Sequence, residues 1–201
     1  MKNKPIIAII YNFFNAISIA TVGTLIISWP LLMTFTVIQK TYLLVHQSPA
    51  SIMHVYSQLL LYLCWPFTTK LKMDKFPTST SAAEHFYECK LLFELAIIIF
   101  VVGLIIYLYL KRRKKLNYIS LTKTEALVFM ILPVVVLPFA LANFDTFFIT
   151  FHKIIFNNNN WLFDPTTDPI INILTEDFFA ACFAVAGMIY ELYFAHFLVR
   201  K

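Results

Sequence analysis

The sequence predicts an all-α integral membrane protein with four transmembrane helices and both termini in the cytoplasm. Sixty per cent of its 201 residues are hydrophobic and only 13% are charged, whereas about a quarter of the residues in a soluble domain are charged. The apolar residues also gather in long runs, which are typical of membrane-spanning helices. We therefore expect one membrane domain over residues 1–201, formed by a helical bundle in lipid.

Each predicted span is an apolar run long enough to cross a bilayer, which takes about 20 residues. The spans are predicted at residues 6–38, 91–110, 125–143 and 178–199. The first exceeds the hydrophobic region of a signal peptide, so it is interpreted as an uncleaved anchor that tilts, kinks near Pro30 or projects beyond the bilayer. Pro133 and Pro138 in the third span are tolerated where neighbouring groups satisfy the freed carbonyls.

The basic residues predict the orientation. Five of the 16 lysines and arginines form the run KRRKK at Lys111–Lys115, and others stand at the two termini. Basic residues that flank apolar runs stay in the cytoplasm, and four spans place both termini and this run on that side. Topology thus accounts for the net charge of +5, and nucleic acid is not a predicted partner.

The two remaining segments, residues 39–90 and 144–177, are predicted to form an extracytoplasmic cap. Within the first, the apolar part of Ser51–Phe67 is too short to span the membrane and is expected to form a re-entrant or interfacial helix. Cys64 and Cys89 could pair on this oxidising side, but nothing in the sequence requires it.

Each outer segment carries a histidine beside a predicted span. His85 stands just before the second span and His152 just after the third. An imidazole titrates near neutrality, so the two could act as base and acid in acyl transfer at a lipid headgroup. Either could also be a plain polar residue of the membrane interface. That plain interpretation is preferred for the other three histidines, which are His46, His54 and His196.

Polar neighbours set His85 and His152 apart from those three. Glu88 lies one helical turn after His85 and could orient its ring. Ser81 followed by Glu84 matches the S-x-x-E capping box of a helix start, whereas Ser79 or Ser81 as a nucleophile would lack a GxSxG elbow. Four carboxylates of the second outer segment could orient a histidine or simply be solvated. These are Asp164, Asp168, Glu176 and Asp177.

A metal site is a weaker interpretation of the same residues. Two histidines with carboxylates could hold zinc, but the chain has no H-E-x-x-H or similar helical spacing. No metal and no other cofactor is therefore predicted.

Two segments resemble the signature of a bacterial family of integral membrane proteins, the lipoprotein intramolecular transacylase (Lit) family. They read FHKIIFNNNNWLFDPTTDPIINILTEDFF at residues 151–179 and TSTSAAEHFYECKLLF at residues 78–93. The longer segment matches at Phe151-His152, Phe156, Asn160-Trp161, Phe163-Asp164-Pro165, Asp168, Ile170-Ile171, Glu176 and Phe178, and the shorter at Ser81, His85-Phe86 and Lys90. The length of the chain and its four spans agree with the same family.

The chain departs from the family pattern at a few positions. Glu88 and Cys89 stand where Asp-Val is more usual, Asn158 stands where a proline or glycine is expected nearby, and Thr175 stands where a proline is common. The last two are loop changes, which alter backbone shape without removing a chemical group.

The resemblance implies acyl chemistry at the outer face of the bacterial cytoplasmic membrane. The substrate would be a diacylated lipoprotein, and the sn-2 acyl chain of its diacylglyceryl-cysteine would move to the α-amine of the same cysteine, which gives the lyso form. Membrane lipids surround the site, and no covalent acyl-enzyme is required. His85 is assigned as general base and His152 as acid or oxyanion partner. Supporting or substrate-positioning roles are assigned to Ser81, Glu88, Asn160, Trp161, Asp164, Asp168 and Glu176.

The four consecutive asparagines at 157–160 are interpreted as structural. Asparagine provides turn geometry and neutral hydrogen-bond donors. Asn160 and Trp161 are expected to close the turn and anchor it at the membrane interface, and the other three asparagines to form a flexible crest.

Two other classes of function stay open at the level of the sequence. One is a non-enzymatic lipid-binding or channel-accessory protein, although a channel should carry ionisable residues within its spans. The candidates Glu94, Glu125 and Glu191 each lie near a helix end. The other is an acyltransferase that uses a different acceptor.

Overall fold

The structure, a computed structural model, describes residues 4–199. These residues form helices and no strands. The long helices are α1 (Lys4–Ile38), α4 (Thr80–Arg112), α5 (Lys123–Ala142) and α7 (Glu176–Val199). The shorter elements are α2 (Thr41–Leu44), α3 (Pro49–Cys64), α6 (Phe144–Ile155) and the 3₁₀ turns η1 (Leu116–Tyr118) and η2 (Pro169–Asn172).

The four long helices are each long and apolar enough to cross a membrane. In the most apolar part of each, only 6% to 28% of the residues are buried inside the protein. So continuous an apolar surface is stable only against lipid. The predicted all-helical, multi-pass membrane protein is confirmed.

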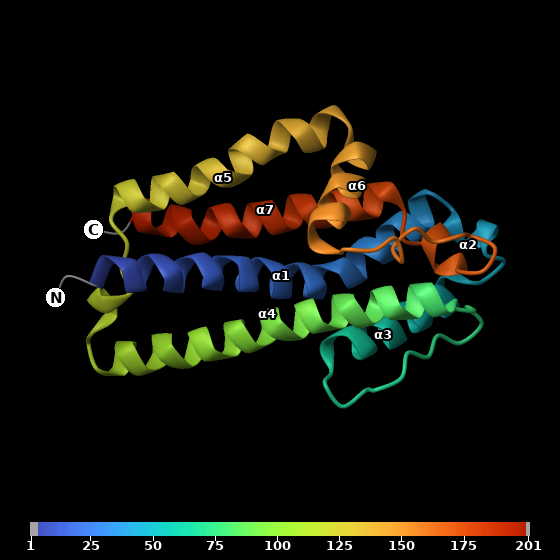
Figure 1. The fold of residues 1–201 in the computed structure, drawn as a ribbon, viewed down its shortest axis with the longest axis horizontal. Coiled ribbons are helices and arrows are strands. Elements are labelled where there is room, and N and C mark those ends of the chain that lie inside the picture. The colour runs from blue at the N-terminus through green and yellow to red at the C-terminus, as the bar shows by residue number, and fades with distance from the viewer. Residues whose placement is uncertain (1–3, 200–201) are drawn as a thin grey trace.

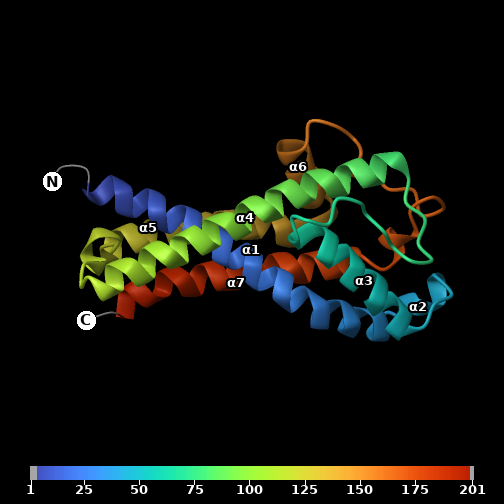
Figure 2. The same ribbon diagram turned by 90° about the horizontal axis from the view of Figure 1, so that it is seen from below.

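Helix α1 is the centre of the bundle. It packs against α4 on one side and α7 on the other, and α5 packs on α7 (Figure 1). Both described ends and the connection between α4 and α5 lie at one end of the bundle, while α2, α3 and α6 lie at the other (Figures 1 and 2). We call these the basic end, which carries Lys111–Lys115, and the cap end. That the basic end faces the cytoplasm stays a prediction.

Helix α1 continues through Pro30 without interruption and extends into the cap end. Its 35 residues extend over about 50 Å at 1.5 Å per residue. Near its far end Leu32 is fully buried, and the Tyr56 hydroxyl of α3 donates a 2.7 Å hydrogen bond to Ser28 Oγ. The far part of α1 therefore belongs to the cap core.

Lys90 of α4 holds α3 in place. Its Nζ donates to the carbonyl oxygens of Tyr62 and Trp65, both at 2.7 Å, and pairs with Glu94 Oε1 at 2.9 Å. The last carbonyls of a helix lack partners within that helix, so a buried lysine satisfies the end of α3 while its own charge is neutralised. This lysine, which matches the family pattern, has a structural explanation.

The start of α4 differs from the predicted capping box. The N-cap is Ser79, whose Oγ accepts from the backbone N–H of Ala82 at 3.1 Å. Ser81 lies inside the helix and Glu84 bonds elsewhere, so the box predicted for these two residues is wrong. Because α4 begins at Thr80, His85 stands in its second turn, on a rigid element and not in a loop.

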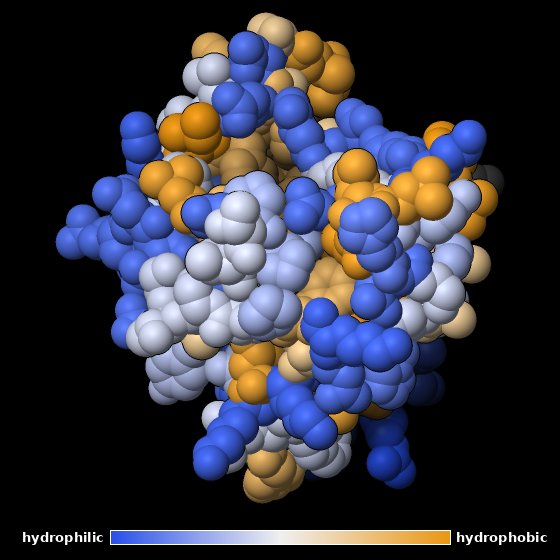
Figure 3. Space-filling view, turned by 90° about the vertical axis from the view of Figure 1, so that its right-hand side faces the viewer, coloured by the Kyte–Doolittle hydropathy of each residue, from blue (hydrophilic) through white to orange (hydrophobic). Residues whose placement is uncertain are grey.

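The outer surface of the cap end is mostly hydrophilic. Viewed end-on, polar side chains dominate and hydrophobic ones show between them (Figure 3). This contrasts with the exposed apolar sides of the long helices.

Candidate active site

A partly open, apolar cavity of about 340 Å³ lies at the cap end. Its wall comes from α1, α3, α4, α6 and α7 and from the segment between α6 and α7. The wall is largely aromatic and aliphatic, and it includes His85, Cys89 and His152. Ligand cavities of this kind take an apolar group and orient it by a few polar side chains.

His85 and His152 face each other across this wall. Their ring centres lie 5.7 Å apart, and the two residues are only 6% and 8% exposed. His152 reaches this place because the chain turns at Asn143, whose Oδ1 accepts from Thr146 N–H at 2.8 Å and caps α6. The structure thus brings together the two histidines that the sequence singled out.

Aromatic rings surround the pair. Phe156 and Phe163 lie 4.7 and 5.7 Å from the His85 ring, between ring centres. Trp161 lies 5.0 Å from the His152 ring in the same measure. These rings exclude water, which strengthens every electrostatic interaction inside the site.

The tautomer of neutral His152 follows from its hydrogen bond. Its Nδ1 lies 2.8 Å from the carbonyl oxygen of Phe148, which can only accept, so Nδ1 carries the proton. Burial lowers the pKa of His152, and the bond to Phe148 raises it in part. Near neutral pH, therefore, His152 is uncharged and its Nε2 is free to accept a proton.

Glu88 stands behind His85, away from the cavity. Its Oε2 lies 3.9 Å from His85 Nδ1, which is too far for a hydrogen bond. Both atoms are buried without a hydrogen-bond partner among the described residues, so a small approach would satisfy both. Catalytic hydrogen bonds are often long in the free enzyme and tighten with substrate bound. The carboxylate favours the proton on Nδ1, which leaves Nε2 to accept, here from the Cys89 thiol at 3.4 Å.

Two of the four asparagines clasp α4. Asn158 Nδ2 donates to Glu88 Oε1 at 2.7 Å, and Asn160 Nδ2 donates to Glu84 Oε2 at 2.9 Å. We call this pair of bonds the asparagine clasp. The prediction of a flexible crest is wrong for Asn158, which sequence reasoning missed. The available signal was the pair of glutamates one helical turn apart, which offers two acceptors on one face of a helix.

Trp161 belongs to the site and not to the membrane interface. It is 7% exposed, and its Nε1 donates to the carbonyl oxygen of Asn158 at 2.9 Å. The prediction of an interfacial anchor is therefore wrong. The indole instead links the asparagine clasp to the ring of His152.

Asp168 acts at a distance from the histidines. It is 2% exposed, and its Oδ1 accepts from the backbone N–H of Ser79 at 2.6 Å while Oδ2 accepts from Thr167 Oγ1 at 2.8 Å. A carboxylate at the start of a helix is stabilised by the free N–H groups there. Asp168 thus fixes the start of α4 relative to the second outer segment.

The three remaining predicted residues do not line the cavity. Asp164 shapes a turn, because its Oδ1 accepts from the backbone N–H of Thr166 at 2.8 Å and from its hydroxyl at 2.7 Å, which lowers the pKa of Asp164. Ser81 is exposed and lies 3.1 Å from Ser79 Oγ. Glu176 is exposed at the start of α7.

Within residues 4–199 no group of three or more His, Cys, Asp or Glu is arranged to hold a metal ion. Cys64, Cys89 and Cys182 are free thiols.

The fold and the site define a polytopic helical membrane protein with a buried histidine pair on an apolar cavity. The profile of the lipoprotein intramolecular transacylase Lit family matches residues 6–179. The chain therefore belongs to this family and is a membrane transacylase that acts on lipoproteins, as the resemblance predicted.

Solved structures share the fold. The lipoprotein intramolecular transacylase Lit from Bacillus cereus has 23% sequence identity and a TM-score of 0.76 over 97% of this chain and 92% of that one. Two variants of it, with a histidine replaced by arginine or by alanine, give TM-scores of 0.68 at the same identity and the same coverage of this chain, with 88% and 92% of theirs covered. No curated protein sequence matches.

Burial of a neutral His152 predicts a loss of stability in acid. The unfolded chain takes up a proton near the ordinary histidine pKa of about 6.5, whereas the folded protein takes it up only at lower pH. The free energy of unfolding therefore falls as the pH drops below about 6.5 and is unaffected by His152 above it. Thermal unfolding in detergent between pH 7.5 and 5 measures this. The His152→Gln variant should lose less stability on acidification; an equal loss would contradict the assignment.

Proposed function

We propose that the protein moves the sn-2 acyl chain of a lipoprotein's diacylglyceryl-cysteine to the α-amine of the same cysteine. The observation that carries the proposal is the buried histidine pair on an apolar cavity. Such a cavity suits an acyl chain, and the pair stands where its carbonyl carbon would enter. We also propose that the cap end faces the extracytoplasmic side, since the basic residues gather at the other end.

The task of the site is mainly to hold ester and amine together. Both groups belong to one molecule, and correct orientation of two reacting groups contributes several kcal/mol, up to about 7–11 kcal/mol in the best cases. The rigid setting of both histidines, on α4 and at the end of α6, suits this task.

The pair moves one proton. The neutral amine attacks the ester carbonyl, which forms the C–N bond and an oxyanion. His85 Nε2 takes the proton from the nitrogen, and Glu88 stabilises the resulting imidazolium. The oxyanion then collapses, the bond to the glycerol oxygen breaks, and that oxygen receives the same proton. Starting from the neutral amine, the transfer therefore neither consumes nor releases a proton; an ammonium must lose its proton before it can attack.

The tautomer of His152 narrows its role. The proton of neutral His152 lies on Nδ1 and is held by Phe148, so its Nε2 has no proton for an oxyanion. His152 acts as an acid only after it has received the proton that His85 removed. We therefore favour His152 as the relay to the glycerol oxygen over His152 as an oxyanion donor.

The product tests the proposal. A host that makes diacylated lipoproteins should convert diacylglyceryl-cysteine to the N-acyl, monoacylglyceryl isomer when it produces this protein. Tandem mass spectrometry of N-terminal lipopeptides measures the change. The fragment masses distinguish the two isomers, because their intact mass is the same. An unaltered acyl pattern with the protein in the membrane would point to a different acceptor.

Either histidine alone should be indispensable. His85→Ala and His152→Ala should each lower the rate of transfer at least about 100-fold, since general acid–base catalysis contributes 10²–10⁴-fold. His54→Ala is the matched control, because His54 lies in the cap with an exposed side chain and should leave the rate unchanged. Wild-type turnover in both histidine variants would place the site elsewhere.

Removing the two bonds of the asparagine clasp one at a time should distinguish an effect on the position of Glu88 from an effect on the stability of the fold. Asn158→Ala frees Glu88 and should lower the rate roughly tenfold, which corresponds to about 1.4 kcal/mol, a usual contribution for a hydrogen bond to a charge. Asn160→Ala removes the bond to Glu84, which does not face a histidine, and should leave the rate within about twofold. Initial rates against pH and thermal unfolding are measured for both. Equal loss of rate in the two variants would mean that the clasp acts only through the fold.

A further inference from the structure

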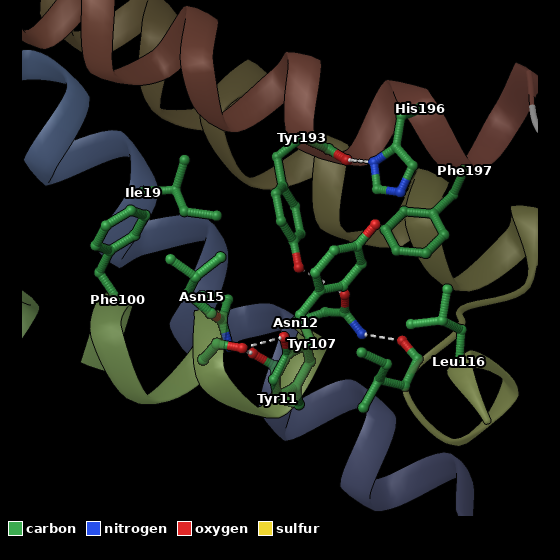
Figure 4. A pocket seen from close by; sticks show the side chains of 13 residues that line it. Tyr11, Asn12, Asn15, Ile19, Phe100, Tyr107, Leu116, Tyr193, His196 and Phe197 are labelled. Atoms are coloured by element: carbon green, nitrogen blue, oxygen red, sulfur yellow. Dashed lines mark hydrogen bonds between the residues drawn. The ribbon is translucent and has the colours of Figure 1, made fainter. Parts of the chain in front are cut away.

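A second cavity, of about 510 Å³, lies at the basic end of the bundle. Side chains of α1, α4 and α7 converge on it, and the turn η1 borders it (Figure 4). The space exists because α4 and α7 both pack on α1 and hardly contact each other. It is remote from the histidine pair and has no part in the reaction derived above.

Some polar groups of this cavity are fully engaged within the protein. Asn12 Nδ2 donates to the carbonyl oxygen of Ile119 at 2.8 Å, and its Oδ1 accepts from the Tyr193 hydroxyl at 2.7 Å. The Tyr11 hydroxyl donates to the carbonyl oxygen of Gly103 at 2.9 Å. These bonds hold α1 against its neighbours, as polar groups do between membrane helices.

Two polar atoms of the wall are not engaged. Within residues 4–199, the Tyr107 hydroxyl and His196 Nε2 have no hydrogen-bond partner, although both residues line the cavity. His196 Nδ1 is already used by the carbonyl oxygen of Tyr193. Both side chains are exposed, so these two atoms are open to a ligand that brings its own polar groups.

Positive charge lies next to the cavity wall at Tyr107. Lys111 follows Tyr107 by one helical turn, and its Nζ lies 5.9 Å from the centre of the Tyr107 ring. The run Lys111–Lys115 continues from there. Of the carboxylates at this end, Glu125 is bound to Thr122 in the capping box of α5, and Glu191 lies on α7. The basic residues therefore outnumber the acidic ones.

We propose that this cavity binds one glycerophospholipid with an anionic headgroup. Its phosphate lies against the basic run, its glycerol and ester oxygens meet Tyr107 and His196, and one acyl chain follows the apolar wall at Ile19, Phe100 and Leu104. The lining requires an apolar chain, and the charge requires an anion, so a water-soluble phosphate satisfies only half of the site. Basic residues next to a span attract anionic lipid by about 1 kcal/mol each.

Native mass spectrometry with equal amounts of phosphatidylglycerol and phosphatidylcholine tests the site. The purified protein should retain one phosphatidylglycerol in preference to phosphatidylcholine, and Lys111→Gln should lower that preference roughly fivefold. Tyr107→Phe should weaken retention, whereas Tyr109→Phe should not. Tyr109 is the matched control, because it lies on the same helix with Arg113 over its ring at 5.6 Å but outside the cavity.

A blocking variant completes the test. Ile19→Trp fills the cavity and should abolish selective retention, whereas Ile17→Trp, on the exposed side of the same helix, should keep it. Equal retention of both lipids by the wild type, or unchanged retention in Ile19→Trp, would overturn the proposal. Competition by soluble glycerol phosphate as strong as that by the lipid would also overturn it, because the acyl chain would then contribute nothing.

Discussion

The arrangement of the site depends on the hydrogen bond from Asn158 to Glu88. It joins two segments that lie 70 residues apart in the chain, and it holds the carboxylate that stands behind His85. The carbonyl oxygen of the same asparagine accepts from Trp161, whose ring packs on His152. One residue thus connects both histidines, although it contacts neither. A loop that moved away from α4 would release the carboxylate and the indole together.

One asparagine can connect both histidines because helix α4 has a different partner on each of its faces at the cap end. The bond between Asp168 and Ser79 fixes its start, Lys90 donates to the last carbonyl oxygens of α3, and His85 lines the cavity. A helix that carries these contacts cannot rotate or slide without breaking several at once. The precision that proton transfer requires therefore comes from a rigid helix, while the neighbouring segments are fitted to it.

The parts of the structure that depend on composition and periodicity could be predicted from the sequence. Apolar runs predicted the four spans. An even number of spans then placed the basic residues at one end and both outer segments, with His85 and His152, at the other. The errors concern residues whose place is decided by distant partners. Ser79 displaces Ser81 as cap because Asp168 holds its N–H, and Trp161 is buried because a histidine lies under it. No local pattern contains that information, so the family resemblance identified these segments without revealing their contacts.

The two cavities show how the same constraint leads to different outcomes. In each, polar side chains lie among apolar ones, where an unpaired group is costly. At the cap end Glu88 stands behind His85 and the carbonyl oxygen of Phe148 holds His152 Nδ1. This leaves His152 Nε2 free and His85 Nε2 with only the weak donor Cys89. At the basic end the Asn12 amide joins α1 to its neighbours, while the Tyr107 hydroxyl and His196 Nε2 stay open and Lys111 lies beside Tyr107. A reaction site needs polar groups that are held in place but still open on one side. A lipid site needs only that an anionic, hydrogen-bonding ligand be more stable there than the bare wall, and the arrangement at the basic end meets that weaker requirement.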